Sequence, residues 1–270
     1  HALLDDGHAV DLIDREGIAA GTSAGNDGWI AHLDTLPLAS PKAWRHFPRW
    51  ALDPLGPLAI RPSYLPALMP WLARFVSASR PSRIEASTQA IAALNGLALP
   101  AWRKRLQAVG LGHHLRERGL LSVWADAGGY RAAQPLLERQ RGLGIPVETL
   151  DAAALRALEP ALGPRAVAGA LYPTGCHVSD PLDFTRALAQ AALDRGAELR
   201  RFEVVDVRAG GDHVTICTSF DTLAQYDRIV VATGAWSKPL AASLGDSVPL
   251  DTERGYNVTL PSGRLGLTRP

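Results

Sequence analysis

The sequence of 270 residues has few cysteines, few aromatic residues and no excess of charge of either sign. Cys176 and Cys217 are far apart and form no C-x-x-C motif, which favours two reduced core thiols over a disulfide framework. With 28 basic and 27 acidic residues the net charge is +1, so the chain has no general attraction for nucleic acid. No apolar run reaches the roughly 18 residues that a membrane-spanning helix needs.

The apolar content is high instead. At 47% apolar residues the chain can bury a large core, and its length exceeds the roughly 100–200 residues of a usual domain. We therefore expect one large or two interleaved domains. The reduced cysteines favour a cytoplasmic location.

The first stretch that indicates a function lies at the beginning of the chain. Residues 1–7 resemble the end of a helix closed by Gly7, and residues 9–16 predict a short strand that ends at Asp14. This order is typical of the second half of a dinucleotide-binding βαβ unit, in which the acid accepts ribose hydroxyls. The glycine-rich phosphate loop is expected about 20 residues before that acid. This position lies before residue 1, so we expect a fragment without that loop that retains a bound dinucleotide poorly.

A loop of small and polar residues follows. Four of the twelve residues 17–28 are glycines, which allow positive φ or a close approach of the backbone to a ligand. Two interpretations stay open: a flexible surface loop, or a loop wrapped over a pyrophosphate or flavin.

The middle of the chain predicts several helices and strands. Apolar periodicity favours a helix over 64–79 that Pro70 kinks or divides, and separate helices over 81–97 and 102–109. Asp151 and Asp180 are typical N-caps, the latter followed by Pro181 at the first turn of a helix that Gly196 closes. Strands are expected over residues 119–124, 166–172, 197–202, 204–208 and 213–218, the last two forming a hairpin.

The strongest single stretch is residues 226–236. Its β-branched run predicts a strand buried on both faces, ending at Thr233 and Gly234. Ligands of open α/β sheets collect at the carboxyl ends of strands, so Asp14 and Gly234 would lie at such ends.

Five motifs occur here in one order: Asp14-Arg15, residues 22–28, Asp180-Pro181, residues 229–236 and residues 249–256. Together they resemble the FAD-dependent amine oxidoreductases of the D-amino acid oxidase superfamily, and most of all bacterial D-amino acid dehydrogenases. The resemblance implies an α/β fold with a Rossmann-like FAD-binding domain, formed by residues 1–118 and 179–246. A mixed-sheet α+β substrate domain, residues 119–178 and 247–270, would be interleaved with it, and both domains would be incomplete.

The resemblance also implies a set of site residues. Asp14 would bind the adenosine ribose with Arg15 beside it, and the loop would lie against the pyrophosphate and isoalloxazine. The full cofactor set would be Asp14, Arg15, Ser23, Ala24, Gly25, Asn26, Val204, Val205, Thr233, Gly234 and Trp236. Candidates on the substrate side are Asn26, Arg254 and Tyr256. Arg254 could hold a substrate carboxylate in its planar fork or be a solvated charge, and Tyr256 could be a packing aromatic.

The implied reaction is oxidation of the C–N bond of a D-amino acid to an imino acid, which hydrolyses to a 2-oxo acid and ammonia. The electrons would pass to a quinone or another acceptor, with the protein cytoplasmic or peripheral at the inner membrane. One alternative is a glycine or sarcosine type of secondary amine oxidase, and another is a non-catalytic nucleotide-binding or interaction protein that keeps the fold. We assign no catalytic residue and expect no metal, because no histidines show ligand spacing.

Overall fold

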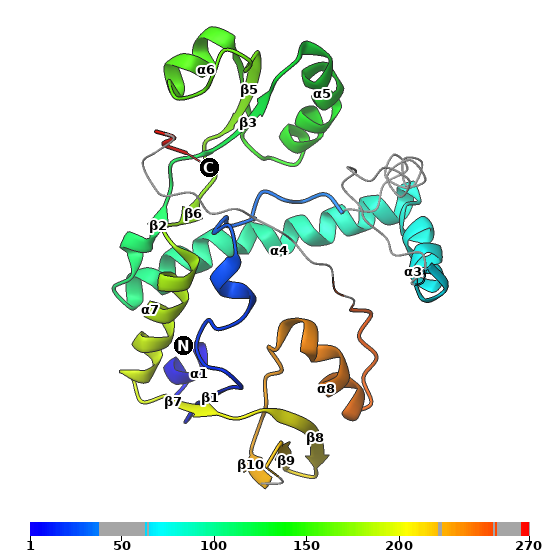
Figure 1. Ribbon diagram of the computed structural model, residues 1–270, viewed down its shortest axis with the longest axis vertical. Helices are drawn as coiled ribbons and strands as arrows, with labels where there is room; N and C mark the ends of the chain where they lie inside the picture. The colour runs from blue at the N-terminus through cyan, green and yellow to red at the C-terminus, as the bar shows by residue number, and fades with distance from the viewer. Residues whose placement is uncertain (38–62, 64, 221–222, 251, 253–265, 270) are drawn as a thin grey trace. The chain divides into compact units, whose positions relative to one another are not determined.

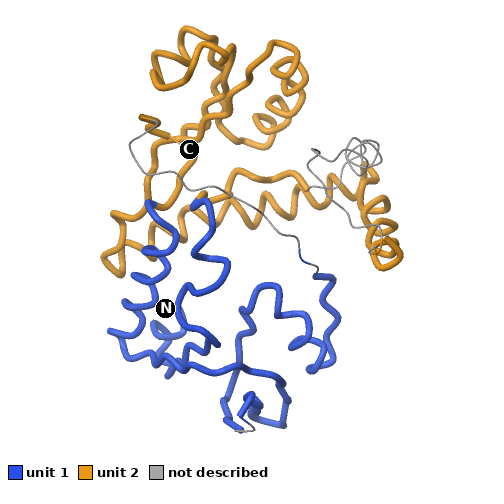
Figure 2. The backbone as a smooth tube through the Cα atoms, viewed as in Figure 1, with its two compact units in different colours: residues 1–28, 179–264 blue, residues 29–178, 265–270 orange. Residues whose placement is uncertain are grey.

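The structure, a computed structural model, describes residues 1–37, 63, 65–220, 223–250, 252 and 266–269. Two compact units, each assembled from separated stretches of the chain, make up the protein (Figure 2). Unit 1 contains His1–Gly28 and Ser179–Arg264, and unit 2 contains Trp29–Val178 and Leu265–Pro270. Helices and short sheets occur in both, which confirms the expected α/β class. The functional domain boundaries stay a prediction, and by their contacts residues 29–118 group with unit 2.

A pair of parallel strands begins the fold of unit 1. Helix α1 (Ala2–Asp5) is followed by Gly7 at a φ of 83°, and strand β1 (Asp11–Asp14) pairs in parallel with β7 (Glu198–Arg201). Helix α7 (Pro181–Leu193) leads into β7. Its N-cap is Asp180, whose carboxylate accepts the backbone N–H of Asp183, as the sequence predicts.

An antiparallel sheet forms the other part of unit 1. Strands β8 (Val204–Gly210), β9 (His213–Thr218) and β10 (Leu223–Tyr226) lie in the order β10-β9-β8 (Figure 1). The predicted hairpin between β8 and β9 is confirmed. Helix α8 (Ser237–Ser243) packs on β8, and Val207, Ile216 and Leu240 form the buried core between them.

The long strand predicted over residues 226–233 is wrong in its extent. Strand β10 ends at Tyr226, and residues 227–233 belong to no strand in the part of the chain that the structure describes. Ile229 and Val231 still pack against the core of unit 1, whereas Val230 is 72% exposed. A ladder needs a neighbouring strand, and none of the described residues pairs with this segment.

Two consecutive helices begin the regular structure of unit 2. Helix α3 (Leu65–Ala78) contains Pro70, and α4 (Pro81–Ala108) is a single helix of 28 residues. The predicted break between residues 97 and 102 is therefore wrong. Pro100 removes one backbone hydrogen bond, but Leu99 and Leu106 on the same helix are buried and hold it in place across the proline.

The sheet of unit 2 is antiparallel. It contains β3 (Leu120–Trp124), β5 (Ala168–Tyr172) and β4 (Glu148–Asp151) in that order. Helix α5 (Ala127–Gly142) packs on β3 and β5, and α6 (Ala152–Leu158) packs on β4 and β5. The side chain of Asp151 accepts the N–H groups of Ala153 and Ala154, so the predicted N-cap is confirmed. A separate pair joins β2 (Leu115–Arg116) and β6 (His177–Val178).

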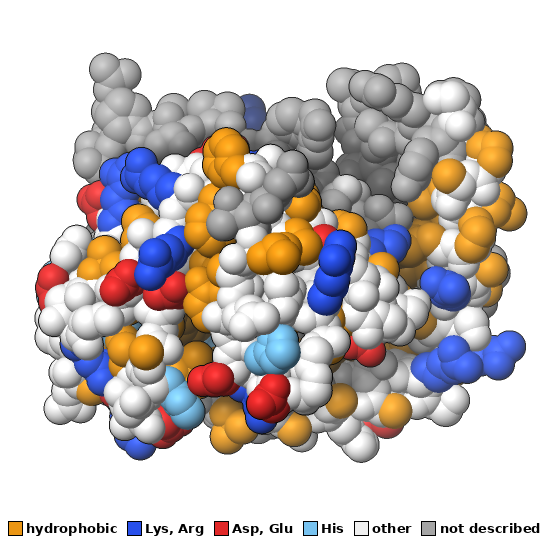
Figure 3. Space-filling view, turned by 90° about the horizontal axis from the view of Figure 1, so that it is seen from below, with side chains coloured by type: hydrophobic (Ala, Val, Ile, Leu, Met, Phe, Trp, Pro, Cys, Tyr) orange, Lys and Arg blue, Asp and Glu red, His pale blue; other side chains and the backbone are white. Residues whose placement is uncertain are grey.

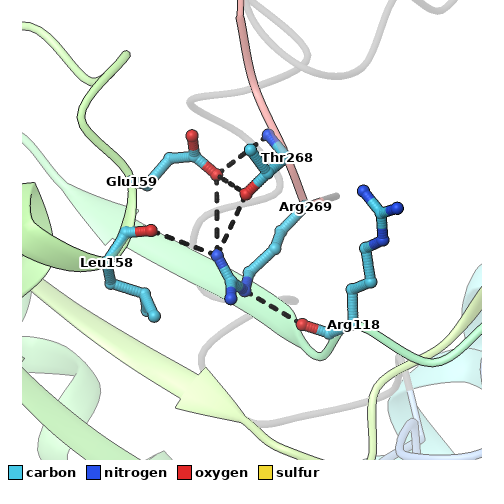
Figure 4. A network of polar contacts seen from close by, with 5 residues as sticks. All are labelled: Arg118, Leu158, Glu159, Thr268 and Arg269. Atoms are coloured by element: carbon cyan, nitrogen blue, oxygen red, sulfur yellow. Dashed lines mark hydrogen bonds and ion pairs between the residues drawn. The ribbon is translucent and has the colours of Figure 1, made fainter.

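A buried carboxylate holds residues 266–269 on unit 2. Glu159, which follows α6, is 1% exposed, and its Oε2 accepts the backbone N–H of Thr268 at 3.0 Å and the Thr268 hydroxyl at 2.7 Å (Figure 4). The guanidinium of Arg269 lies 3.9 Å from the same oxygen and donates to the carbonyls of Leu158 and Arg118. These contacts join segments about 110 residues apart in the sequence.

Candidate functional site

The candidate site lies at the carboxyl end of the parallel strand pair in unit 1. Asp14 is the last residue of β1 and is in register with Arg201, the last residue of β7. Strand β1 is half-buried up to Ile13 and exposed at Asp14. The strand therefore presents one carboxylate to solvent at the sheet end where α/β folds bind ligands.

The two oxygens of Asp14 have different surroundings. Oδ1 accepts the backbone N–H groups of Glu16 at 2.8 Å and Gly17 at 2.7 Å, so it fixes the turn that follows the strand. Oδ2 accepts no hydrogen bond from any described residue. The carboxylate is thus already oriented by the protein, with one oxygen left to accept hydroxyl protons of a ligand.

The tight turn depends on Gly17. Its φ is 117°, a region that L side chains rarely adopt, and an added Cβ would lie 3.0 Å from Nη2 of Arg201. The glycine lets the loop leave β1 directly over the end of β7. This fixes the start of the loop in relation to Asp14.

Arg15 and Trp236 come together, although 220 positions separate them in the sequence. The guanidinium of Arg15 lies over the indole ring of Trp236, 5.5 Å from its centroid. Arg15 also forms exposed ion pairs with Glu16 at 3.3 Å and Glu203 at 3.4 Å. The structure thus places a cation and an aromatic ring, predicted separately from the sequence, beside the end of β1.

The glycine-rich loop contains one turn of 3-10 helix, Thr22–Gly25, which packs against α7. Ser23, Ala24 and Gly25 are exposed on this turn. The side-chain oxygen of Asn26 accepts the backbone N–H of Gly28 at 2.7 Å. The loop is therefore a defined surface turn of unit 1, and its assignment to pyrophosphate and flavin stays a prediction.

Val204 and Val205 lie at the start of β8, where the ladder has a β-bulge. Val204 is in register with Thr218 and Asp206 with Cys217, so Val205 has no partner in the register. Its side chain is 54% exposed. A bulge leaves a backbone N–H and C=O outside the regular ladder, which is the kind of group that a base edge could contact.

Thr233 and Gly234 lie just before α8. Gly234 has a φ of 54° and begins the short 3-10 helix Gly234–Trp236, and the Thr233 hydroxyl lies 3.2 Å from that of Ser237.

Two of the predicted substrate-side residues, Arg254 and Tyr256, lie outside the described residues.

A polar cluster at the opposite end of β1 was missed by sequence reasoning. The hydroxyl of Tyr226 donates to Oδ2 of Asp11 at 2.8 Å, and Nε of Arg200 donates to the same oxygen at 3.0 Å. Burial and the Asp11 carboxylate raise the pKa of Tyr226 to about 12. The cluster connects β1, β7 and β10 at the end of β1 that is farther from Asp14. No sequence pattern predicts a contact between residues 215 positions apart.

Both cysteines are free and buried, as the sequence indicated. Sγ of Cys176 lies 3.8 Å from Nδ1 of His32, and burial raises the pKa of this thiol to about 11. Burial also lowers the pKa of His177. No group of three or more metal-ligating side chains is found in the part of the chain that the structure describes.

Comparison with known proteins identifies relatives for the entire chain. The model of the family described as FAD dependent oxidoreductase (DAO) matches residues 1–270. A D-amino-acid oxidase of Bradyrhizobium diazoefficiens is 35% identical over 97% of this chain and 63% of its own length. A D-amino acid dehydrogenase 2 of Ralstonia nicotianae is 32% identical over 98% of this chain and 64% of its own length. The chain therefore spans just under two thirds of these relatives.

A solved structure shares the fold. A glycine oxidase of Geobacillus kaustophilus superimposes with a TM-score of 0.58 at 23% identity, over 90% of this chain and 53% of its own. At this identity the likeness shows the fold alone.

Proposed function

The chain belongs to the FAD-dependent oxidoreductase (DAO) family, and from this premise we propose that the protein oxidises the C–N bond of D-amino acids. The product is an imino acid, which water hydrolyses to a 2-oxo acid and ammonia. The names of the two bacterial relatives support D-amino acids as the substrate class. The sequence alone left glycine and other secondary amines as an alternative.

The observation that carries the proposal is the Asp14 carboxylate. One of its oxygens is fixed by the turn and the other accepts no bond from a described residue, at the end of a parallel strand. An oriented anionic acceptor fits the adenosine ribose of FAD, because ribose hydroxyls donate hydrogen bonds to such an acid. The residues present therefore fit the cofactor of the family.

The residues around Asp14 would hold the rest of the cofactor. Arg15, stacked on Trp236, supplies a positive charge beside the adenosine end, and the exposed turn at Ser23 and Gly25 supplies backbone that can approach a phosphate. The bulge at Val205 offers backbone groups to the adenine edge. We assign these roles on the fit of the residue types and their surroundings.

The bound flavin supplies the hydride acceptor for this chemistry. The protein must hold the amino acid with its α-C–H toward that acceptor, and must neutralise the substrate carboxylate. We propose Arg254 for the second task, because a guanidinium pairs with a carboxylate through two parallel hydrogen bonds. No general base is assigned. The lone pair of the neutral amine forms the C=N bond as the hydride leaves the α-carbon, so no base has to remove a proton from that carbon.

Anaerobic reduction tests the proposal on the protein as its source organism produces it. We expect a yellow protein whose flavin absorbance is bleached by D-alanine and other D-amino acids, and not by their L-enantiomers. Bleaching by sarcosine or glycine, and not by D-amino acids, would select the secondary amine alternative. A protein without flavin that no amine reduces would disprove the enzyme proposal and favour a binding protein that keeps the fold.

We further propose that a quinone, or another acceptor in the membrane, receives the electrons. Quinones dissolve in the lipid bilayer, so this acceptor requires a peripheral contact with the membrane. Reoxidation of the reduced protein by a soluble quinone analogue, faster than by oxygen, is the expected result. Faster reoxidation by oxygen would identify an oxidase instead.

A further inference from the structure

The short ribbon of β2 and β6 in unit 2 has two faces. Arg116 of β2 is in register with His177 of β6, so their side chains lie opposite each other on one face. Side chains of successive residues point to opposite faces of a strand. Glu117 and Cys176, the neighbours of this pair, therefore belong to the other face.

The face of Glu117 and Cys176 is turned to helix α4, and its charges are balanced. Nε of Arg103 on α4 donates to the Glu117 carboxylate at 2.7 Å. Burial and the charge of Glu117 raise the pKa of the Cys176 thiol, in agreement with their place on one face. Like every helix in the described part of the chain, α4 lacks the combination of length and apolarity that a membrane span needs. An ion pair thus accounts for the charges on this face.

The face of His177 carries two arginines that are not paired with an acid. Burial and the positive charges of Arg118 and Arg116 lower the pKa of His177, so both guanidinium groups act on the same ring. Both arginines are exposed, and neither side chain has a hydrogen-bond or ion-pair partner among the described residues. In Figure 4 the side chain of Arg118 points away from the contacts of Glu159, in which only its backbone carbonyl takes part. Two unpaired positive charges therefore lie on one side of the ribbon.

This arrangement differs from that of other arginines in the described residues. Arg139 pairs with Glu85 at 2.6 Å, and acidic side chains lie among the basic ones in the left and central parts of the face in Figure 3. Arg116 and Arg118 are two residues apart, so their Cα atoms are separated by about 7 Å at most. Like charges held this close repel each other, and an anion bound between them would remove the repulsion.

We propose that Arg116 and Arg118 form a binding site for a doubly charged oxoanion, either a phosphoryl group or a dicarboxylate. The planar fork of a guanidinium donates two parallel hydrogen bonds to the oxygens of either group, and two forks supply the charge that matches a dianion. All residues of this site belong to unit 2. The proposal goes beyond the oxidation of D-amino acids, and its test does not depend on that activity.

His177 adds a proton-dependent element to this site. Nδ1 of its ring is buried and has no hydrogen-bond partner among the described residues, so no contact there stabilises the charged ring. A bound dianion would neutralise the two arginines that disfavour the imidazolium. Binding of the anion should therefore make His177 easier to protonate.

Isothermal titration calorimetry on the protein as its source organism produces it tests the site. Inorganic phosphate and malonate are the two probes, at an ionic strength kept constant with sodium chloride so that screening does not change. We expect a dianion to bind and the monoanion acetate to bind more weakly. Tighter binding of phosphate would identify a phosphoryl site, and tighter binding of malonate a dicarboxylate site. If neither dianion binds, the proposal is wrong.

Two variants and a matched control locate the bound anion. Arg116→Gln and Arg118→Gln each remove one guanidinium and should weaken binding of the dianion about tenfold. Both positions are exposed, so the far-UV circular dichroism should stay unchanged. Arg131→Gln removes the same charge from the exposed surface of α5 in the same unit and should leave the affinity unchanged. An equal loss in all three variants would indicate a general effect of charge and overturn the proposal.

The ring of His177 gives a second measurement, which a purely structural effect of the substitutions would not reproduce. The pKa of His177, measured from the NMR shifts of its ring protons, should rise when the dianion binds. In Arg116→Gln this pKa should already be higher without the anion, and the anion should raise it less. Arg131→Gln should behave like the unsubstituted protein. If the dianion binds and leaves the pKa of His177 unchanged, the anion lies elsewhere and the proposal fails.

Discussion

At the scale of single residues, Asp14 and Gly17 have different roles in the turn at the end of β1. The carboxylate of Asp14 uses one oxygen for the backbone of the turn, and Gly17 adopts the positive φ that this turn needs. The acid at the strand end was recognisable from the sequence. The sequence did not show that one carboxylate oxygen accepts hydrogen bonds from the turn while the other does not, because this depends on the geometry of the folded turn.

Asp14→Asn removes the charge of the side chain but should keep the conformation of the turn. Asparagine keeps an oxygen that can accept the N–H groups of Glu16 and Gly17, so the turn should persist. The ribose contact loses its anionic acceptor, and we expect FAD to bind about ten to a hundred times more weakly. Fluorescence titration with FAD, on the protein as its source organism produces it, measures this change. Asp194→Asn at the end of α7 is the control, and equal affinity in both variants would remove Asp14 from the site.

Gly17→Ala should destabilise unit 1, whereas Gly96→Ala in helix α4 should not lower the stability of the protein. At Gly17 the added methyl group meets the Arg201 guanidinium at 3.0 Å and the φ is unfavourable, so we expect a loss of about 1–3 kcal/mol in the free energy of unfolding. Gly96 lies inside α4, no atom lies within 4 Å of the added Cβ, and alanine favours a helix over glycine. Urea denaturation of both variants measures the difference, and equal stabilities would contradict the strained turn.

At the scale of elements, predictions held where local chemistry decides the structure. Asp151 and Asp180 were identified as N-caps because a short side-chain oxygen can satisfy the free N–H groups of the first turn. The β8–β9 hairpin followed from its turn residues. The predicted break between residues 97 and 102 and the predicted strand after Tyr226 were wrong. Both depend on tertiary structure, namely the burial of neighbouring residues and the presence of a pairing strand, which no local pattern contains.

Pro100→Ala tests whether α4 is continuous in spite of its proline. Pro100 is exposed inside the helix, where proline costs about 3 kcal/mol relative to alanine. We expect the substitution to raise the free energy of unfolding by about 1–3 kcal/mol. Pro81 occupies the first turn, where a missing N–H does no harm, so Pro81→Ala should change stability little. A stability loss in Pro100→Ala would mean that the helix is interrupted there.

At the scale of the whole molecule, the interleaving of the two units is the feature that sequence patterns predict least well. The chain passes between the two units at residues 28–29, 178–179 and 264–265, so each unit joins segments far apart in the sequence. Tyr226 with Asp11, and Thr268 with Glu159, are contacts between such segments. Order and spacing of motifs indicated two interleaved domains, but no periodicity or turn signal identifies which distant side chains meet.

Glu159→Gln tests how the last described residues are held on unit 2. Glutamine keeps the size of the side chain but loses the charge that faces Thr268 and Arg269, and charge-assisted hydrogen bonds contribute about 1.5–3 kcal/mol. We expect hydrogen exchange at the Thr268 amide to become about tenfold faster or more, since its N–H donates to the carboxylate. The amides of α5 should keep their exchange rates, because the side chain of Glu159 interacts with Thr268 and Arg269 and with no polar group of this helix.

The control for this substitution is Glu138→Gln on the exposed face of α5. It removes the same charge from unit 2 without touching the segment at Thr268, so exchange at that amide should stay unchanged. If Glu159→Gln left the Thr268 amide equally protected, the backbone carbonyls that Arg269 binds would suffice to hold the segment. The difference between the two variants therefore measures what one buried carboxylate contributes to joining distant parts of the chain.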